Sequence, residues 1–305
     1  MTPSSSARVL LSGASGLIGR ALLPALKARG FEVTRLVRGT PSGDDQMRWD
    51  PTQPVSPAAL SGIDCIIHLA GESVVGRWTE GKKAAIRNSR VEGTRQLARA
   101  LAQATRRPGV LISASAIGYY GDRDDEILRE ESLPGRGFLA EVCRDWEAAS
   151  APASESGIRT VQMRIGVVLS SSGGALQKML PPFRLGLGGK LGSGRQWMSW
   201  IHIQDLVAAV LQILGNDALR GPINLVGREP VRNADFTRTL ASVLSRPALG
   251  PVPGFAVRLL FGQMADEVLL ASQRVEPAKL MAGGFAFQYP DLRKALESLL
   301  QAGPS

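Results

Sequence analysis

Histidine and cysteine are the scarcest residues in this 305-residue sequence, with two of each. Cys65 and Cys143 lie in no metal-binding spacing, and so few cysteines in a long chain are expected to be reduced and mostly buried thiols. The only histidines are His68 and His202. The sequence therefore has too few His and Cys side chains for a zinc cluster or a histidine-based charge relay, and we expect no metal site.

Long apolar runs and blocks of like charge are also missing. No apolar run reaches the ~18 residues of a membrane helix, and residues 1–7 have no signal-peptide pattern. We therefore expect a cytoplasmic protein with no membrane as a partner. The net charge is +9, but Lys and Arg alternate with acids and no five like charges run together. This pattern favours a basic surface with some phosphate-binding arginines and no specific nucleic-acid partner.

The segment RVLLSGASGLIG, residues 8–19, combines a short apolar run, three glycines and the start of a helical pattern. Strand, glycine turn and helix form the context of a dinucleotide-binding motif. Gly13 would allow the tight turn, and Gly16 would let backbone N–H groups approach a pyrophosphate at the helix N-terminus. Gly19 would let the helix pack closely on the strand. The spacing is GxxGxxG, and a plain turn is the alternative interpretation.

The next two predicted strands carry further signs of a cofactor. Residues 32–38 alternate and end in Arg38, where an NAD-preferring fold has an acid on the ribose 2′-OH. An arginine would instead pair with a 2′-phosphate, so Arg38 favours NADP(H); a solvent-facing arginine is the alternative. Residues 63–69 predict a buried parallel strand that ends in Ala70 and Gly71, small enough for a cofactor to lie on.

Strand and helix patterns alternate as far as residue 169, which predicts an α/β fold with a Rossmann-type doubly wound parallel sheet. After residue 113 the expected elements are a helix at 138–156, stepped near Pro152, and a strand at 160–169. We expect an NADP-binding domain over 1–169 plus about 200–228. A smaller α/β substrate-side domain would comprise 170–199 and 229–305.

Later boundaries rest on single residues. Asp205 and Asn233 are expected to be the N-caps of helices over 206–214 and 233–244. Residues 255–271 are expected to be helical. Residues 170–200 are rich in glycine and would form a loop that covers a ligand. Trp197, Trp200 and His202 are interpreted as core and hydrogen-bonding residues at a domain join.

Four separated motifs resemble the extended short-chain dehydrogenase/reductase superfamily, in its NAD-dependent epimerase/dehydratase group. They are GASGLIG at 13–19, HLAG at 68–71, the serine-rich strand end with YG at 113–121, and WIHIQDLV at 200–207. Longer runs, including WDP at 49–51, are similar to an atypical branch known only as epimerase family proteins. The resemblance covers nearly the whole chain, including a tail of unassigned function at about 250–298.

The resemblance implies NADP(H) as the cofactor and assigns its site residue by residue. The matching positions are Gly13, Ser15, Gly16, Leu17, Ile18, Arg38, Leu69, Ala70, Gly71, Arg90 and Val168. Arg90 stands where extended members usually have an asparagine, and Val168 lies near the nicotinamide half. Many members are homodimers, so the resemblance suggests a homodimer as well as an unidentified small-molecule substrate.

One departure bears on chemistry. The superfamily uses Tyr-xxx-Lys with a nearby Ser or Thr, because the lysine lowers the pKa of the phenol. None of the three tyrosines here has a lysine four residues later, and Phe138 and Val142 stand in about the expected places. An NADP-dependent oxidoreductase or epimerase of a small carbonyl or sugar-like substrate would then use Ser115, Tyr119 or Tyr120. The alternatives are packing roles for the tyrosines and a non-catalytic NADPH-binding regulator or redox sensor.

Overall fold

A seven-stranded parallel sheet is the centre of the computed structural model, which describes residues 7–248 and 250–301. Its strand order is β11-β7-β5-β4-β1-β2-β3, and every neighbouring pair is parallel. The strands are β1 (Arg8–Ser12), β2 (Glu32–Val37), β3 (Gln46–Arg48), β4 (Cys65–His68), β5 (Val110–Ala116), β7 (Arg159–Ile165) and β11 (Gly221–Leu225). The chain winds outward from β1 in both directions, which confirms the predicted doubly wound α/β fold.

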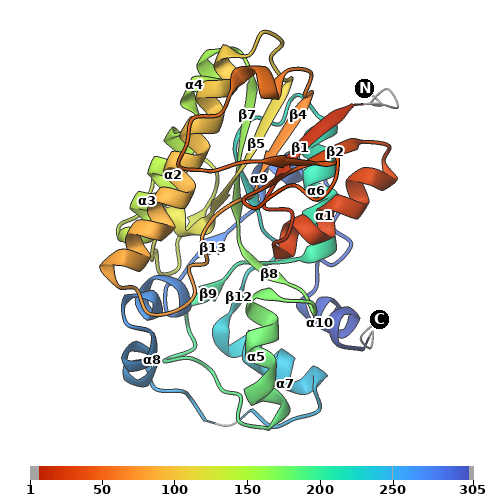
Figure 1. The fold of residues 1–305 in the computed structure, drawn as a ribbon. Coiled ribbons are helices and arrows are strands. Elements are labelled where there is room, and N and C mark those ends of the chain that lie inside the picture. Colours follow the sequence, from red (N-terminus) through yellow and green to blue (C-terminus); the bar gives the residue numbers. More distant parts are fainter. Residues whose placement is uncertain (1–6, 249, 302–305) are drawn as a thin grey trace.

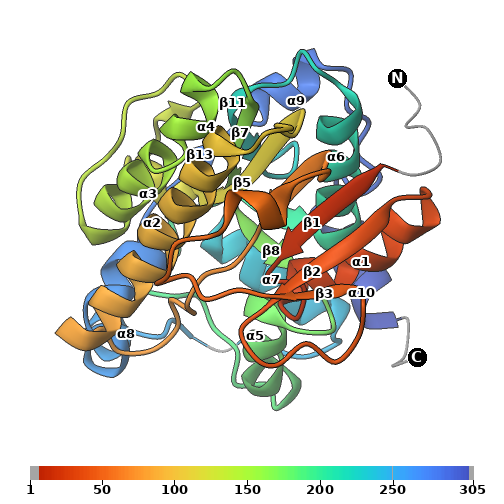
Figure 2. The ribbon, with the colours of Figure 1, turned by 45° about the horizontal axis from the view of Figure 1, so that its top comes forward.

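Helices cover both faces of the sheet (Figures 1 and 2). One face carries α2 (Glu80–Gln103), α3 (Phe138–Ala148) and α4 (Ala151–Glu155), and the other carries α1 (Leu17–Ala28) and α6 (Ile203–Gly215). Apolar side chains of α1 and α6 pack with one set of strand residues, and those of α2 pack with another set. Successive strand residues point to opposite faces, so a sheet covered on both sides needs the nearly continuous apolar strands of this sequence.

A smaller group of helices lies beyond the carboxyl ends of the strands, at the bottom of Figure 1. It comprises α5 (Gly174–Arg184), α7 (Asn233–Val243), α8 (Gly254–Phe261) and α10 (Leu292–Gln301). Trp200, Phe236 and Leu296 are buried in a common apolar cluster of α5, α7 and α10. The sequence-based division into two domains stays a prediction.

Short elements join this group to the sheet. Three strand pairs are β8 (Val167–Leu169) with β10 (Trp200–His202), β9 (Trp197–Met198) with β12 (Val231–Arg232), and β6 (Ile127–Leu128) with β13 (Arg274–Val275). The remaining elements are η1 (Pro57–Leu60), η2 (Ile117–Tyr120), the π-helical turn η3 (Ala265–Leu269) and α9 (Ala278–Ala282). The glycine-rich segment 170–200 is therefore only partly loop, since α5 occupies residues 174–184 and short strands lie at its end.

The two expected N-caps were wrong. His202 is the N-cap of α6, and Asp205 lies in its first turn, where it accepts hydrogen bonds from the backbone N–H groups of Gln288 and Tyr289. Asn233 is already the first residue of α7, and its side chain accepts from the Leu191 N–H. Both side chains bond to distant backbone, which no local capping pattern reveals.

The helix expected over 255–271 is also shorter. It ends at Phe261, because Gly262 adopts a positive φ of 60° that ends the helix, and η3 follows. Trp200 and His202 are buried at the junction of the sheet and the lower helices, as expected. Both cysteines are free thiols; Cys143 is buried and Cys65 partly buried.

Candidate functional site

The turn between β1 and α1 requires its glycines. Gly13 has φ 70°, and a Cβ there would lie 2.8 Å from the Leu69 carbonyl carbon. A Cβ on Gly19 would lie 2.6 Å from the Cα of Ala14. The turn is closed by the Gly16 N–H, which donates to the Gly13 carbonyl at 3.0 Å. Because no side chain caps α1, its first N–H groups are available to an anion.

A cavity of about 550 Å³ opens at this turn. Seven of the eleven predicted cofactor residues line it: Gly13, Ser15, Gly16, Arg38, Leu69, Ala70 and Gly71. The structure thus brings together the glycine turn, the end of β2 and the end of β4. Leu17, Ile18, Arg90 and Val168 are not among its lining residues.

Ten further residues line the cavity, and those with polar or charged groups that the sequence reasoning missed are Arg20, Arg35, Trp49, Glu72 and Ser89. The two arginines could have been found, since one follows the last glycine of the turn and the other precedes Arg38 by three residues. Arg35 is held by Asp45 at 2.7 Å. Arg38 is exposed, and the described residues place no carboxylate within ion-pair distance of it. Arg38, like Arg20, is therefore a cation of this cavity without a direct ion pair in the described residues and can receive a phosphate.

The ends of β1 and β4 are fixed to one another by Ser12. Its Oγ lies 2.7 Å from Nδ1 of His68 and accepts from the backbone N–H groups of Leu69 and Ala70 at 3.0 and 3.2 Å. His68 is fully buried, and burial lowers its pKa to about 4, so the ring is neutral. These hydrogen bonds fix the position of the backbone at the end of β4, which lines the cavity. The role of His68 is therefore structural.

Arg90 does not line the cavity but contacts the backbone of residues that do. Its Nη1 donates to the carbonyl of Glu72 at 2.9 Å and to that of Ile86 at 3.1 Å. Its guanidinium also lies over the ring of Trp146 and in contact with Gly71. Burial lowers the pKa of Arg90. These contacts place Arg90 beneath the β4 end, where it shapes the wall through Gly71 and Glu72.

Val168 lies in β8, paired with Ile201 of β10. The segment after β8 returns to the start of α1, because a Cβ on Gly173 or Gly174 would meet the side chain of Leu17. Val168 therefore belongs to the strand that leads to the glycine-rich segment beside the cofactor turn.

The helix that would carry Tyr-xxx-Lys is apolar at both positions. Phe138 and Val142 pack with Trp78 and Met264 in one cluster, so the C-terminal tail covers this part of α3. Phe138 cannot exchange a proton and Val142 cannot bind a ribose hydroxyl. This helix supplies no acid or base where the superfamily has them.

Ser115 and Tyr120 belong to a buried polar network around Arg164. Arg164 donates to both carboxylate oxygens of Glu147 at 2.8 Å, and Ser115 Oγ donates to the same carboxylate at 2.7 Å. Burial opposes the charge of Arg164, but Glu147 holds its pKa above the usual value. The Tyr120 hydroxyl lies 2.7 Å from Asn224 Oδ1, and burial raises its pKa to about 12. Both hydroxyls are thus engaged in hydrogen bonds within this network, and their catalytic role stays a prediction.

Tyr119 differs from its neighbour. Its ring stacks on the Arg164 guanidinium, 3.5 Å from the ring centroid, and meets the Tyr120 ring edge-on. It is partly exposed, whereas Tyr120 is fully buried. Of the three predicted catalytic residues, Tyr119 is the one whose side chain is both ordered by its neighbours and open to solvent.

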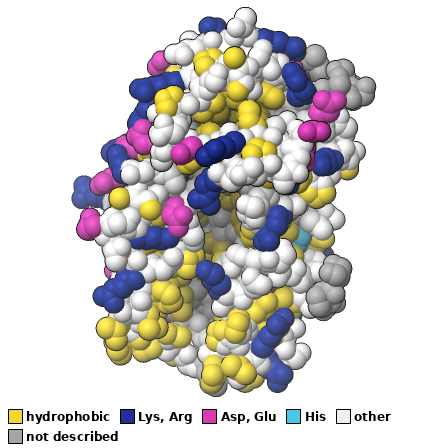
Figure 3. Space-filling view, viewed as in Figure 1, with side chains coloured by type: hydrophobic (Ala, Val, Ile, Leu, Met, Phe, Trp, Pro, Cys, Tyr) yellow, Lys and Arg dark blue, Asp and Glu magenta, His cyan; other side chains and the backbone are white. Residues whose placement is uncertain are grey.

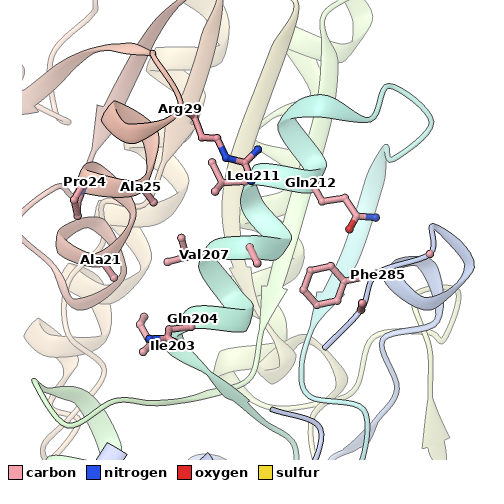
Figure 4. A pocket seen from close by; sticks show the side chains of 13 residues that line it. Ala21, Pro24, Ala25, Arg29, Ile203, Gln204, Val207, Leu211, Gln212 and Phe285 are labelled. Carbon is pink, nitrogen blue, oxygen red and sulfur yellow. The ribbon is translucent and has the colours of Figure 1, made fainter. Parts of the chain in front are cut away.

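A larger cavity, of about 860 Å³, lies between α1 and α6 (Figure 4). Ala21 and Pro24 face Val207 and Leu211 across it, and Phe285 closes one side. None of the predicted site residues lines it, and its walls carry no carboxylate. It offers a mainly apolar groove with no acid–base chemistry.

Neither a metal-binding cluster nor a membrane-spanning helix is found in the described ranges 7–248 and 250–301. No group of three or more His, Cys, Asp or Glu side chains there is placed to hold a metal ion. Across the same ranges, no helix is long and apolar enough to span a bilayer.

The turn, the sheet and the cavity are those of a dinucleotide-binding protein, and comparison with known proteins identifies the family. Residues 9–226 match the NAD dependent epimerase/dehydratase family, and this chain belongs to it. Residues 252–299 match a domain of unknown function, DUF1731, which covers the tail that packs on α3.

Relatives share nearly the whole length. The chain is 43% identical to epimerase family protein Mb2239 of Mycobacterium bovis over 293 residues, covering 95% of this chain and 97% of that protein. It is 37% identical to epimerase family protein SDR39U1 of Bos taurus, with 96% and 99% covered. The crystal structure of human SDR39U1 (isoform 2) with NADPH superposes with a TM-score of 0.89 at 35% identity, covering 97% and 99%.

Proposed function

We propose that the 550 Å³ cavity binds NADP(H). The glycine turn would accept the pyrophosphate at the start of α1, where a Cβ on Gly13 would collide with backbone. Arg38 would pair with the 2′-phosphate, and Leu69, Ala70 and Gly71 would support the ribose side. The human relative crystallised with NADPH supports this assignment. Arg38 at the rim of the cavity is the observation that carries the choice of NADP(H) over NAD(H).

We further propose that the protein is an oxidoreductase or epimerase of a small carbonyl or sugar-like substrate. The nicotinamide would supply or accept hydride at the substrate carbon. The protein would supply the matching proton at the substrate oxygen, and Tyr119 is the group we assign to this step. Its exposure and its fixed position over Arg164 support the assignment.

A second candidate is a non-catalytic NADPH-binding regulator. The apolar cluster around Phe138 and Val142 favours it, because this cluster replaces the superfamily's acid with packing. The regulator would retain the cofactor cavity and lose only the proton transfer.

Tyr119→Phe separates the two. NADPH oxidation is followed by absorbance over a panel of aldehydes, ketones and sugar nucleotides. The enzyme predicts turnover that falls by about 10²-fold or more in the variant. Tyr289→Phe is the matched control, because Tyr289 stacks on His202 near α10, and its turnover should be unchanged. Tight NADPH binding without turnover on any compound would favour the regulator.

A further inference from the structure

The lower end of the molecule exposes an unusual set of large apolar side chains. Phe255, Leu259 and Leu260 of α8 are 72%, 73% and 66% exposed. Leu185 and Leu187, just after α5, are 74% and 60% exposed. We call these five residues the apolar end surface. Gathered apolar surface of this kind on a folded chain marks an interaction site rather than ordinary scatter.

The two segments that carry the apolar end surface are joined. The Val252 N–H donates to the Lys190 carbonyl at 2.8 Å, and the Gly192 N–H donates to the Val252 carbonyl at 2.9 Å. Gly186 packs against Pro247. The segment after α5 therefore runs beside the segment that leads into α8, and Figure 3 shows hydrophobic side chains over both at the bottom of the view.

The two segments that carry the apolar end surface have cations and no acids. Residues 170–200 and 244–262 contain no Asp or Glu. Their cations are Lys178, Arg184, Lys190, Arg195, Arg246 and Arg258. Figure 3 shows Lys and Arg beside the hydrophobic groups at the bottom of the view, where no Asp or Glu is seen, while Asp and Glu lie in the upper and middle parts of that face. Arg258 is paired with Asp266 of the following turn at 2.7 Å. The two segments therefore carry a net positive charge next to the apolar end surface.

We propose that the apolar end surface docks on an anionic lipid bilayer. The exposed Phe and Leu side chains would enter the boundary between headgroups and acyl chains, and the flanking cations would face the lipid phosphates and carboxylates. Because these side chains protrude from a short helix and a neighbouring segment, they match the deformable surface of a bilayer. Nucleic acid would pair with the cations but leave the four leucines and Phe255 in water. Docking of this kind needs no spanning helix.

The test is sedimentation of the purified full chain with vesicles. Phosphatidylcholine vesicles are compared with phosphatidylcholine–phosphatidylserine vesicles at low and high salt. We expect binding to the anionic vesicles, weakened by salt and nearly absent with phosphatidylcholine alone. The double variant Phe255→Ser/Leu259→Ser should lose about tenfold or more in partitioning. Arg184→Ser and Arg246→Ser should each cost roughly fivefold.

Leu133→Ser is the matched control, because Leu133 is 77% exposed but lies outside the two acid-free segments, and its binding should equal that of the unchanged chain. NADPH titration shows that each variant is folded. The proposal is overturned if the unchanged chain ignores anionic vesicles. It is also overturned if the double variant binds anionic vesicles as tightly as the unchanged chain does. The same holds if the surface mediates self-association or DNA binding and no vesicle binding.

Discussion

The Glu267 carboxylate accepts hydrogen bonds from the backbone N–H groups of Phe138 at 3.1 Å and of Leu139 at 2.7 Å. A side chain of the C-terminal tail therefore caps α3 from 128 residues away in the sequence. The helix whose counterpart carries the superfamily's Tyr-xxx-Lys is thus held by a segment that belongs to DUF1731.

Glu267→Ala should lower the free energy of unfolding by about 1–2 kcal/mol, since two N–H groups at the start of α3 lose their acceptor. Urea denaturation measures this loss. Asp266→Asn is the neighbouring control: its ion pair with Arg258 is half exposed on both sides and should contribute less than about 1 kcal/mol. Equal losses in the two variants would contradict the capping role.

The close packing of the glycine turn predicts different effects of an added methyl group at two glycines. Gly19→Ala should destabilise the protein by about 1–3 kcal/mol and weaken NADPH binding, because the new Cβ meets the backbone of the turn. Gly81→Ala, in the first turn of α2, meets nothing within 4 Å and should be neutral or stabilising. Thermal unfolding and NADPH titration of both variants check this. A Gly19→Ala protein with normal cofactor affinity would argue against the turn as the pyrophosphate site.

The Arg164–Glu147 pair predicts non-additive losses. The two side chains are 3% and 13% exposed, so Arg164→Met leaves a carboxylate without its partner in a nearly dry site. We expect a loss of about 3–5 kcal/mol. Adding Glu147→Gln should recover part of it, and a double-mutant cycle by urea denaturation measures the coupling. Strictly additive losses would show that the pair is not a coupled unit.

Histidine burial predicts how stability depends on pH. Burial lowers the pKa of His68 and of His202 from 6.5 to about 4. The unfolded chain therefore binds more protons between these values, and stability falls as the pH drops from about 6.5 toward 4. Each histidine should cost about 2 kcal/mol between pH 7 and pH 5. His68→Gln should remove about half of the drop, and an unchanged drop would contradict this origin.

The sheet could be predicted from the sequence because strands that are buried on both faces appear as short, nearly continuous apolar runs. The apolar runs that became β1, β4, β5 and β7 and the helical patterns between them are visible one segment at a time. The short edge strand β3 completes the sheet through its pairing with β2. Cavity residues at the ends of these strands followed from the same alternation.

The caps and the catalytic candidates needed tertiary contacts. Asp205 looks like an N-cap in the sequence, but its partners are the N–H groups of residues 288 and 289. Ser115 and Tyr120 look available until Glu147 and Asn224 are brought beside them. Neither neighbour is recognisable from spacing, because each comes from a distant helix or strand.

The central claim is that the cavity selects NADP(H) through Arg38. Calorimetric titration of the purified protein with NADPH and with NADH tests it most directly, with Arg38→Asp and the exposed Arg99→Asp of α2 as a matched pair. We expect tight binding of NADPH, weak binding of NADH, and loss of the preference in Arg38→Asp alone. Equal affinity for the two cofactors, or an unchanged preference in Arg38→Asp, would contradict the account.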